Sequence, residues 1–406
     1  MRIKLLLLFG LFFGSFVVQA QEYLQMIDAG TYKVQEIIDS AEAYFADKDK
    51  GRGSGYKQFK RWEYNALRRV KENGYLPTTE ERLDELQQWN AYLNETAAGR
   101  NVLPDNWQEL GPKSWSATSG WNPGVGRLTG LAIDEGDANH MIVGANTGGV
   151  WRTDDGAQTW TPLSDYFSNL SVYSVAIDPT DSDTYFFGSN SGKIFKSTDA
   201  GATWNLLGSI GNSRVNKIVI NPSNANMIFA TAENSGIYRT EDAGVNWIKV
   251  ISGDNNGYDV EFKPGDFSVV YASGSGFHKS TDGGATFSTI GGFTSGPKMI
   301  GVSADNPDVV YVLEANSGRF GGFYTSNDSG SSFTKLNNGG LNFFGYSTSG
   351  NDNSGQAPRD MGIAVNPTNV NEVHIAGILT WRSTNGGVTF SCTSDWIPGN
   401  AASQNI

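Results

Sequence analysis

Six short segments repeat an aspartate, or once an asparagine, in one sequence context, and such prominent carboxylates could bind a metal ion or act in acid catalysis. Each segment is an octapeptide that resembles Ser/Thr-x-Asp-x-Gly-x-Thr-Trp/Phe. Its third position is held by Asp155, Asp199, Asp242, Asp282, Asp328 and Asn385, and its last position by Trp160, Trp204, Trp247, Phe287, Phe333 and Phe390. Six equivalent copies cannot form one active site, and they lack the D-x-[DN]-x-[DN]-G spacing of a calcium loop. We therefore expect these residues to have a structural role.

The octapeptide fits a tight hairpin between two strands. Its carboxylate can accept hydrogen bonds from backbone N–H groups of the turn, and a glycine at the fifth position permits a backbone conformation that Cβ would hinder. The terminal ring can pack between neighbouring elements, which is worth ~1.5–3 kcal/mol. The first copy has Ala157 at the glycine position and the sixth has Asn385. Both departures are expected to weaken their turns without breaking the pattern.

Catalysis of glycoside hydrolysis would need two carboxyl groups that face each other across a cleft. Glu233 and Glu314 are the main acids in the links between the second and third strands of the repeat described below. Arg127 could bind an anionic substrate, but the other arginines of such a cluster cannot be assembled from the sequence. A structural role is favoured for Arg127, and no catalytic residue is assigned.

An aromatic group marks the longest departure from the repeat, at residues 337–359. Phe343, Phe344 and Tyr346 lie there among glycines and asparagines. This composition favours an exposed aromatic platform for a carbohydrate or protein ligand. A flexible loop, or a contact with a neighbouring domain, is an equally good interpretation.

The elements that position these residues repeat with the octapeptide. Its third positions are 44, 43, 40, 46 and 57 residues apart. Each period holds two apolar strands, a glycine-rich link and a third strand, and the octapeptide then turns into a fourth strand. Four strands per period of about 44 residues predict an all-β fold, a β-propeller of at least six blades. The links between second and third strands share one face with the connections from fourth to first strands, and ligands usually bind on that face near the axis.

The octapeptides resemble the Asp-box, or BNR, repeats of sialidases, sortilin (VPS10-like) receptors and xyloglucanase-like glycoside hydrolases. The resemblance covers roughly residues 111–393, about 70% of the chain. Gly124-Val-Gly-Arg-Leu128 and Gly148-Gly-Val-Trp-Arg152 resemble the first blade of the sortilin and xyloglucanase-like members. Gly55–Trp62 is similar to the lead-in of large secreted Bacteroidetes proteins. Because such proteins continue through more blades, we expect the propeller to be incomplete at its C-terminus.

The resemblance leaves two functions open. Xyloglucanase-like enzymes carry a catalytic aspartate in the first-blade link, where this chain has Asn146, and an amide cannot replace a carboxylate as nucleophile or general acid. A non-catalytic module that binds an extracellular protein, peptide or polysaccharide is therefore the favoured function. A secreted glycoside hydrolase of xyloglucanase or sialidase type is the alternative, so the sequence does not decide whether the chain is an enzyme.

The N-terminal part differs from the repeats. Residues 1–20 read as a signal peptide, with Arg2 and Lys4 ahead of a 14-residue apolar run that ends near Ala20. Residues 21–105 have helical periodicity, and residues 106–406 hold the repeats. These features predict secretion, or display at the cell surface, through a bacterial envelope.

Composition excludes several classes of function. Glycine accounts for 50 of 406 residues and aromatics for 12%, which is typical of many short strands. The net charge of −12 argues against nucleic acid as a partner. One cysteine and three scattered histidines give no metal-site spacing, so no metal and no cofactor are expected. No segment after the signal peptide is apolar enough to predict a membrane span.

Overall fold

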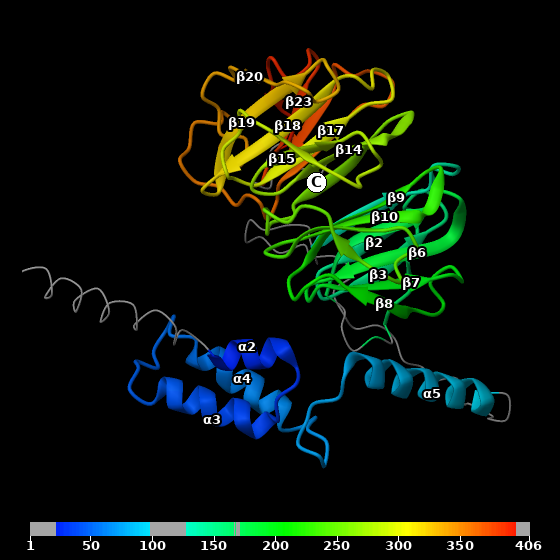
Figure 1. The fold of residues 1–406 in the computed structure, drawn as a ribbon, viewed down its shortest axis with the longest axis vertical. Helices are drawn as coiled ribbons and strands as arrows, with labels where there is room; N and C mark the ends of the chain where they lie inside the picture. The colour runs from blue at the N-terminus through cyan, green and yellow to red at the C-terminus, as the bar shows by residue number, and fades with distance from the viewer. Residues whose placement is uncertain (1–21, 98–126, 166, 168–170, 395–406) are drawn as a thin grey trace, which may run out of the picture. The chain divides into compact units, whose positions relative to one another are not determined.

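A computed structural model describes residues 22–97, 127–165, 167 and 171–394 (Figure 1). The chain divides into two compact units, and the division falls within residues 98–126. The expected signal peptide lies outside the described residues, as do the segment around Gly124 and the end of the chain.

The first unit is helical and has an aromatic core. Its helices are α2 (Glu22–Ala29), α3 (Val34–Phe45), α4 (Tyr56–Ala66) and α5 (Thr79–Ala97). Tyr23, Phe45 and Phe59 are almost completely buried, and the ring centres of Phe45 and Phe59 lie 5.9 Å apart. Apolar residues at helical spacing on α2, α3 and α4 supply this core, which buries the side of each helix that carries them.

The second unit is a β-propeller of six four-stranded antiparallel sheets, as the repeat predicts. Blades 1 to 3 contain β1 (Leu128–Ile133), β2 (Met141–Ala145), β3 (Gly149–Thr153), β4 (Thr161–Pro162); β5 (Val172–Asp178), β6 (Asp181–Ser189), β7 (Lys193–Ser197), β8 (Asn205–Ser209); β9 (Val215–Asn221), β10 (Asn224–Ala232), β11 (Gly236–Thr240) and β12 (Ile248–Lys249). Blades 4 to 6 contain β13 (Asp259–Lys263), β14 (Asp266–Ser273), β15 (Phe277–Ser280), β16 (Ser288–Ile290); β17 (Lys298–Val302), β18 (Val310–Asn316), β19 (Arg319–Ser326), β20 (Thr334–Leu336); β21 (Gly362–Val365), β22 (Val373–Ala376), β23 (Thr380–Ser383) and β24 (Ser391–Cys392).

The hydrophobic core lies between neighbouring blades. The second strand of a blade is covered on both faces, so it reads as a continuous apolar run rather than an alternating one. Tyr185, Phe186 and Phe187 of β6 are at most 1% exposed. Separate apolar clusters join blades 2 and 3, 3 and 4, 4 and 5, and 5 and 6. The stack of blades thereby holds the first strands, and the links at their ends, in fixed positions.

The octapeptides form the turns between third and fourth strands, as the second copy illustrates. Asp199 Oδ1 accepts the backbone N–H of Thr203 at 2.8 Å and the Ser197 hydroxyl at 2.8 Å, and Oδ2 accepts the Thr203 hydroxyl at 2.6 Å. Gly201 has φ +84°, and a Cβ there would lie 2.5 Å from Leu163 Cδ1 of the preceding blade. Both carboxylate oxygens of Asp199 are therefore engaged in hydrogen bonds within the turn. The turn also packs against the preceding blade.

These turn carboxylates predict a loss of stability in acid. Hydrogen bonds, first from the threonine hydroxyl of each turn, lower the pKa of Asp155, Asp242 and Asp282 from 3.8 to about 2. A carboxylate whose pKa is lowered by folding stabilises the fold at any pH above its pKa in the unfolded chain. That contribution disappears as the pH falls from about 4 toward 2. We expect the urea midpoint to fall across this window, and to fall less steeply in Asp282→Asn. The exposed Asp39→Asn, on α3, is the control; equal pH slopes in all three proteins would contradict a role for these turns.

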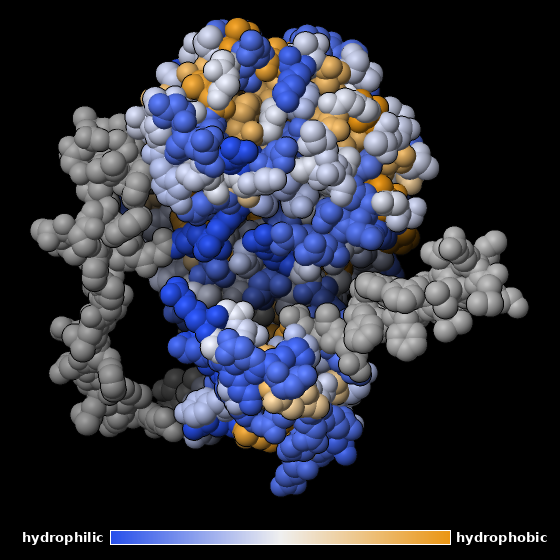
Figure 2. Space-filling view, turned by 90° about the vertical axis from the view of Figure 1, so that its left-hand side faces the viewer, coloured by the Kyte–Doolittle hydropathy of each residue, from blue (hydrophilic) through white to orange (hydrophobic). Residues whose placement is uncertain are grey.

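One face of the molecule is mainly polar. In the view of Figure 2 hydrophilic residues cover most of the described surface, and apolar patches are scattered among them. Within the described ranges no helix is long and apolar enough to cross a membrane.

Candidate functional site

One face of the propeller gathers the starts of the first strands. Arg127 directly precedes β1, Arg214 precedes β9 and Tyr258 precedes β13, while Tyr173 is the second residue of β5. Glu233 joins them from the link between β10 and β11. Because first strands lie innermost and point the same way, these positions converge around the axis. We call these five residues the arginine–tyrosine cluster.

Two guanidinium groups lie near the Tyr173 ring in this cluster. Arg127 Cζ is 6.0 Å from the ring centre and Arg214 Cζ is 5.5 Å from it. Both distances are within the range of cation–π attraction. Arg214 Nη2 also donates to Glu233 Oε1 at 2.7 Å, and Arg214 Nε lies 2.6 Å from Glu233 Oε2. The cluster thus presents one arginine paired with Glu233, one arginine without that partner, and an aromatic ring near both.

Two titratable groups in or beside the cluster, Tyr258 and Asp360, have raised pKa values. Burial raises the pKa of the Asp360 carboxyl, and the charges of Arg359 and Arg127 oppose that rise. Burial also raises the pKa of Tyr258, with the charges of Glu233 and Asp254 adding to it. For Asp360, the effect of burial is therefore larger than the opposing effect of the two arginine charges.

Asn146, the residue in place of the first-blade aspartate, lies beside this cluster. Its backbone N–H donates to the Arg127 carbonyl at 3.3 Å, and it forms an isolated β-bridge with Ser171 of the next blade. Its neighbour Thr147 has φ 70°, a left-handed conformation that is uncommon for a β-branched residue. Asn146 therefore positions the backbone next to Arg127.

The structure corrects the expectation for Glu314. This residue lies within β18 rather than in a link, and the turn is formed by Ser317 and Gly318. Its side chain is 0% exposed, Oε2 accepts the Tyr324 hydroxyl at 2.8 Å, and Oε1 accepts the Thr294 N–H at 2.8 Å. The glycines that follow Glu314 in the sequence indicate a turn that begins at this residue. The apolar run of β18 instead extends the strand past Glu314 to Asn316. Glu314 cannot contact a ligand in this conformation.

The structure also corrects the expected aromatic platform. Phe343 and Phe344 are 0% and 1% exposed. The Phe343 ring centre lies 4.6 Å from that of Phe320 in blade 5 and 4.9 Å from that of Phe390 in blade 6. The insertion passes between these blades, where burying its aromatic rings is more favourable in free energy than leaving them in water. Phe343 and Phe344 are therefore core residues.

Tyr346 is the partly exposed member of that group. Its hydroxyl accepts a hydrogen bond from Gln356 Nε2 at 2.7 Å, and its backbone N–H donates to Asp352. Asn342 Nδ2 also contacts Asp352 Oδ1 at 3.1 Å. Side-chain amides and carboxylates thus order the insertion from within.

A charged group that the sequence analysis missed lies on the first strands of blades 3 and 4. Lys217 Nζ is 2.6 Å from Glu261 Oε1 and 3.4 Å from Asp259 Oδ1. Asp259 Oδ2 accepts the Ile300 N–H of blade 5 at 2.8 Å, which gives it a structural role. Burial raises the pKa of Glu261, Lys217 opposes that rise, and Asp259 adds to it. The alternation Asp259-Val-Glu-Phe-Lys263 was the available signal, because it places charges on one side of β13.

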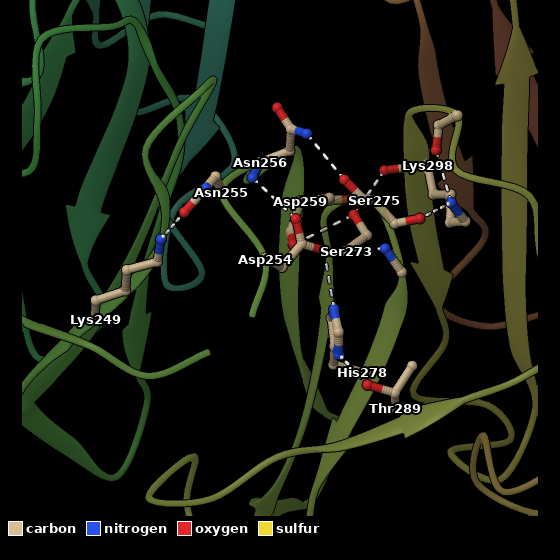
Figure 3. Close-up of polar contacts among 12 residues, drawn as sticks. Lys249, Asp254, Asn255, Asn256, Asp259, Ser273, Ser275, His278, Thr289 and Lys298 are labelled. Atoms are coloured by element: carbon tan, nitrogen blue, oxygen red, sulfur yellow. Dashed lines mark hydrogen bonds and ion pairs between the residues drawn. The ribbon is translucent and has the colours of Figure 1, made fainter. Parts of the chain in front are cut away.

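Buried polar contacts close the same face at blades 4 and 5 (Figure 3). His278 Nε2 lies 3.1 Å from Asp254 Oδ2, and Nδ1 lies 3.0 Å from the Thr289 hydroxyl. Lys298 Nζ donates to the carbonyls of Ser275, Thr294 and Gly296 at 3.0, 2.6 and 2.6 Å. These buried groups satisfy one another, whereas the Arg214 and Glu233 side chains of the arginine–tyrosine cluster are each 26% exposed.

Among the described residues, no group of three or more His, Cys, Asp or Glu side chains is arranged so that it could hold a metal ion.

Comparison with solved structures supports the propeller. A family 74 glycoside hydrolase (GH74) from Niastella koreensis matches with a TM-score of 0.52 and 22% identity over 66% of this chain and 45% of that one. The GH74 xyloglucanase of Xanthomonas campestris matches with a TM-score of 0.53 and 15% identity, over 67% of this chain and 45% of the xyloglucanase. YCF48 bound to D1 peptide matches with a TM-score of 0.46 and 18% identity, over 66% of this chain and 82% of YCF48. The chain spans less than half of the two hydrolases, and at these identities they establish the fold alone. No protein-family model and no curated protein matches the sequence.

Proposed function

We propose that the chain is a secreted, non-catalytic β-propeller that binds an extracellular partner through the arginine–tyrosine cluster. The observation that carries the proposal is the approach of Arg127 and Arg214 to the same ring, that of Tyr173. A carboxylate can pair with Arg127 while an apolar or sugar face stacks on the ring. The ligand group is therefore a carboxylate, on a peptide or on an acidic polysaccharide.

The positions of the predicted acids support binding rather than hydrolysis. Glu233 is held by Arg214, and Glu314 is completely buried. Glu314 therefore lacks the hydrogen-bond reach to a substrate that proton transfer needs, and Glu233 is engaged by its ion pair with Arg214.

The proposal predicts that Arg127→Gln weakens ligand binding while leaving the fold intact. A glycan array with uronic-acid and neutral oligosaccharides, and a peptide array with free and amidated C-termini, supply the probes. Loss of one charge-assisted contact of ~1.5–3 kcal/mol corresponds to roughly a 10- to 150-fold loss of affinity. Tyr173→Ala is expected to weaken the same probes.

Arg382→Gln on β23 is the matched control. Arg382 is not part of the cluster, and its Nη2 lies 2.7 Å from Glu372 Oε1. Binding that survives Arg127→Gln and Tyr173→Ala would contradict the proposed site. A preference for neutral over acidic probes would contradict the proposed ligand chemistry.

Glu261 supports the alternative, a polysaccharide hydrolase. A carboxyl with a raised pKa can serve as general acid, and Glu261 has that property on a first strand. Reducing-sugar release from xyloglucan that Glu261→Gln abolishes, with binding retained, would establish this function instead.

A further inference from the structure

Blade 5 carries a groove of about 490 Å³ where strand β20 ends and the insertion of residues 337–359 begins. A volume of roughly 300–1,000 Å³ is typical of small-molecule sites in proteins. The groove is lined by Phe320, Lys335, Leu336, Asn338 and Leu341, among others. None of these residues belongs to the arginine–tyrosine cluster, so the groove is independent of the function proposed above.

The walls of the groove are held by hydrogen bonds within the chain. The backbone N–H of Phe320 donates to Asn342 Oδ1 at 3.0 Å, which ties β19 to the insertion. Asn338 Nδ2 donates to the Gly387 carbonyl of blade 6 at 2.8 Å, which ties the start of the insertion to the next blade. A ligand thus meets walls that are already formed, and this lowers the entropic cost of binding.

The insertion supplies one apolar side of the groove. Octapeptides five and six are 57 residues apart, against 40 to 46 for the other pairs, so the added chain belongs to this blade. Leu341 of the insertion lines the groove together with Phe320 of β19 and Leu336 of β20. All three side chains pack against the core of blades 5 and 6 and are only half-buried. The groove therefore presents apolar surface on a rigid base.

Lys335 places a positive charge beside these apolar side chains. Its Nζ donates to the Gly321 carbonyl at 2.8 Å and lies 5.4 Å from the centre of the Tyr324 ring. A Cβ on Gly322 would lie 2.8 Å from Lys335 Cε, so the missing side chain of Gly322 lets the lysine lie along β19. Within the described ranges this ammonium thus pairs with a neutral carbonyl and not with a carboxylate. An anion can reach it without breaking an ion pair.

We propose that the groove binds a small organic acid with an apolar body. Its carboxylate pairs with Lys335 Nζ, and its apolar body packs between Phe320 and Leu341. The charge pair fixes the orientation of the ligand, and burial of the apolar body supplies most of the affinity.

The lining also argues against two other classes of ligand. Lys335 is the charged side chain that the structure places in the lining, and a single ammonium matches a carboxylate monoanion better than a phosphate dianion. The apolar side chains favour an apolar body over a sugar, whose hydroxyl groups lose water and need hydrogen-bond partners in return.

Ligand-observed NMR titration of the whole protein with three related probes tests the proposal. Phenylbutyrate has both features, phenylbutanol lacks the charge, and acetate lacks the apolar body. We expect phenylbutyrate to bind about fivefold more tightly than phenylbutanol, as one partly exposed charge pair allows, and acetate not to bind.

Three variants locate the probe. Lys335→Gln is expected to remove the preference for phenylbutyrate over phenylbutanol, because it keeps the apolar walls and removes the charge. Gly322→Ala is expected to weaken phenylbutyrate alone, because it displaces the lysine without neutralising it. Leu341→Glu is expected to abolish the binding of both probes. Lys335 is exposed, so the Lys335→Gln test holds even where Leu341→Glu disturbs the fold.

Lys249→Gln is the matched control, because Lys249 pairs with Tyr238 in blade 3 in the register in which Lys335 pairs with Tyr324 in blade 5. Arg127→Gln is the second control, and both controls are expected to leave phenylbutyrate binding unchanged. Absence of phenylbutyrate binding, equal affinity for the acid and the alcohol, or a preference for the acid that survives in Lys335→Gln would each overturn the proposal. Loss of binding in Arg127→Gln would place the probe in the arginine–tyrosine cluster and overturn it as well.

Discussion

Trp204→Ala is expected to reduce the free energy of unfolding by ~3–5 kcal/mol, the usual range for removal of a buried tryptophan. Trp204 ends the second octapeptide and is 3% exposed. Its ring centre lies 4.9 Å from that of Phe187, and its Nε1 donates to the carbonyl of Leu163 in the preceding blade at 3.1 Å. The substitution therefore leaves a cavity and an unpaired carbonyl between two blades. Urea denaturation followed by circular dichroism measures the loss.

Two further variants separate the ring from its hydrogen bond. Trp204→Phe keeps most of the apolar volume and removes the donor to Leu163, so a loss of about 1 kcal/mol is expected. Trp160→Ala removes a less buried ring at the same octapeptide position, and a smaller loss than for Trp204→Ala is expected. Equal urea midpoints for Trp204→Ala and the unmodified protein would show that the octapeptide ring does not hold the blades together.

The propeller was predictable because its evidence is periodic. An octapeptide that recurs six times fixes the turn between third and fourth strands, and the apolar runs between copies supply the other strands. Period and strand number together leave few folds other than a propeller. The helical unit was predictable for a similar reason, since its apolar positions follow helical spacing.

The candidate site was predictable only in part, because contacts across blades have no sequence period. The sequence pointed to Arg127 and Glu233. It did not point to Tyr173 or Arg214, because their contact depends on how neighbouring blades pack. Phe343 misled because glycine and asparagine around it read as an exposed loop. Its burial depends on the gap between blades 5 and 6, which the local sequence does not describe.

Buried charges are hard to recognise in a sequence for the same reason. Lys298 opens β17 in a position where surface exposure is the ordinary expectation for lysine. Its side chain is 0% exposed, and burial lowers the pKa of its ammonium group while Glu314 opposes that change. Three carbonyls, two of them within four residues of Lys298 in sequence, and the Glu314 carboxylate compensate for the desolvation.

Lys298→Met is therefore expected to reduce the free energy of unfolding by ~3–5 kcal/mol, the range for removing one partner of a buried ion pair. Glu314 Oε1 lies 3.4 Å from Lys298 Nζ and would remain as a buried charge. The carbonyls of Thr294 and Gly296 would also lose their donor. Lys249→Met is the matched control on the same face, since Lys249 makes an exposed contact with Asn255 and a change within about 0.5 kcal/mol is expected.

The double variant Lys298→Met/Glu314→Leu decides whether the pair itself or the packing around it is responsible. Removing both charges eliminates the uncompensated carboxylate, so the double variant is expected to be more stable than Lys298→Met alone. Strictly additive losses in urea denaturation would show that Lys298 acts through its carbonyl contacts and not through Glu314. An unchanged urea midpoint for Lys298→Met would contradict any stabilising role of this lysine, and the links at blades 4 and 5 would then be held by their other contacts, such as that between Asp254 and His278.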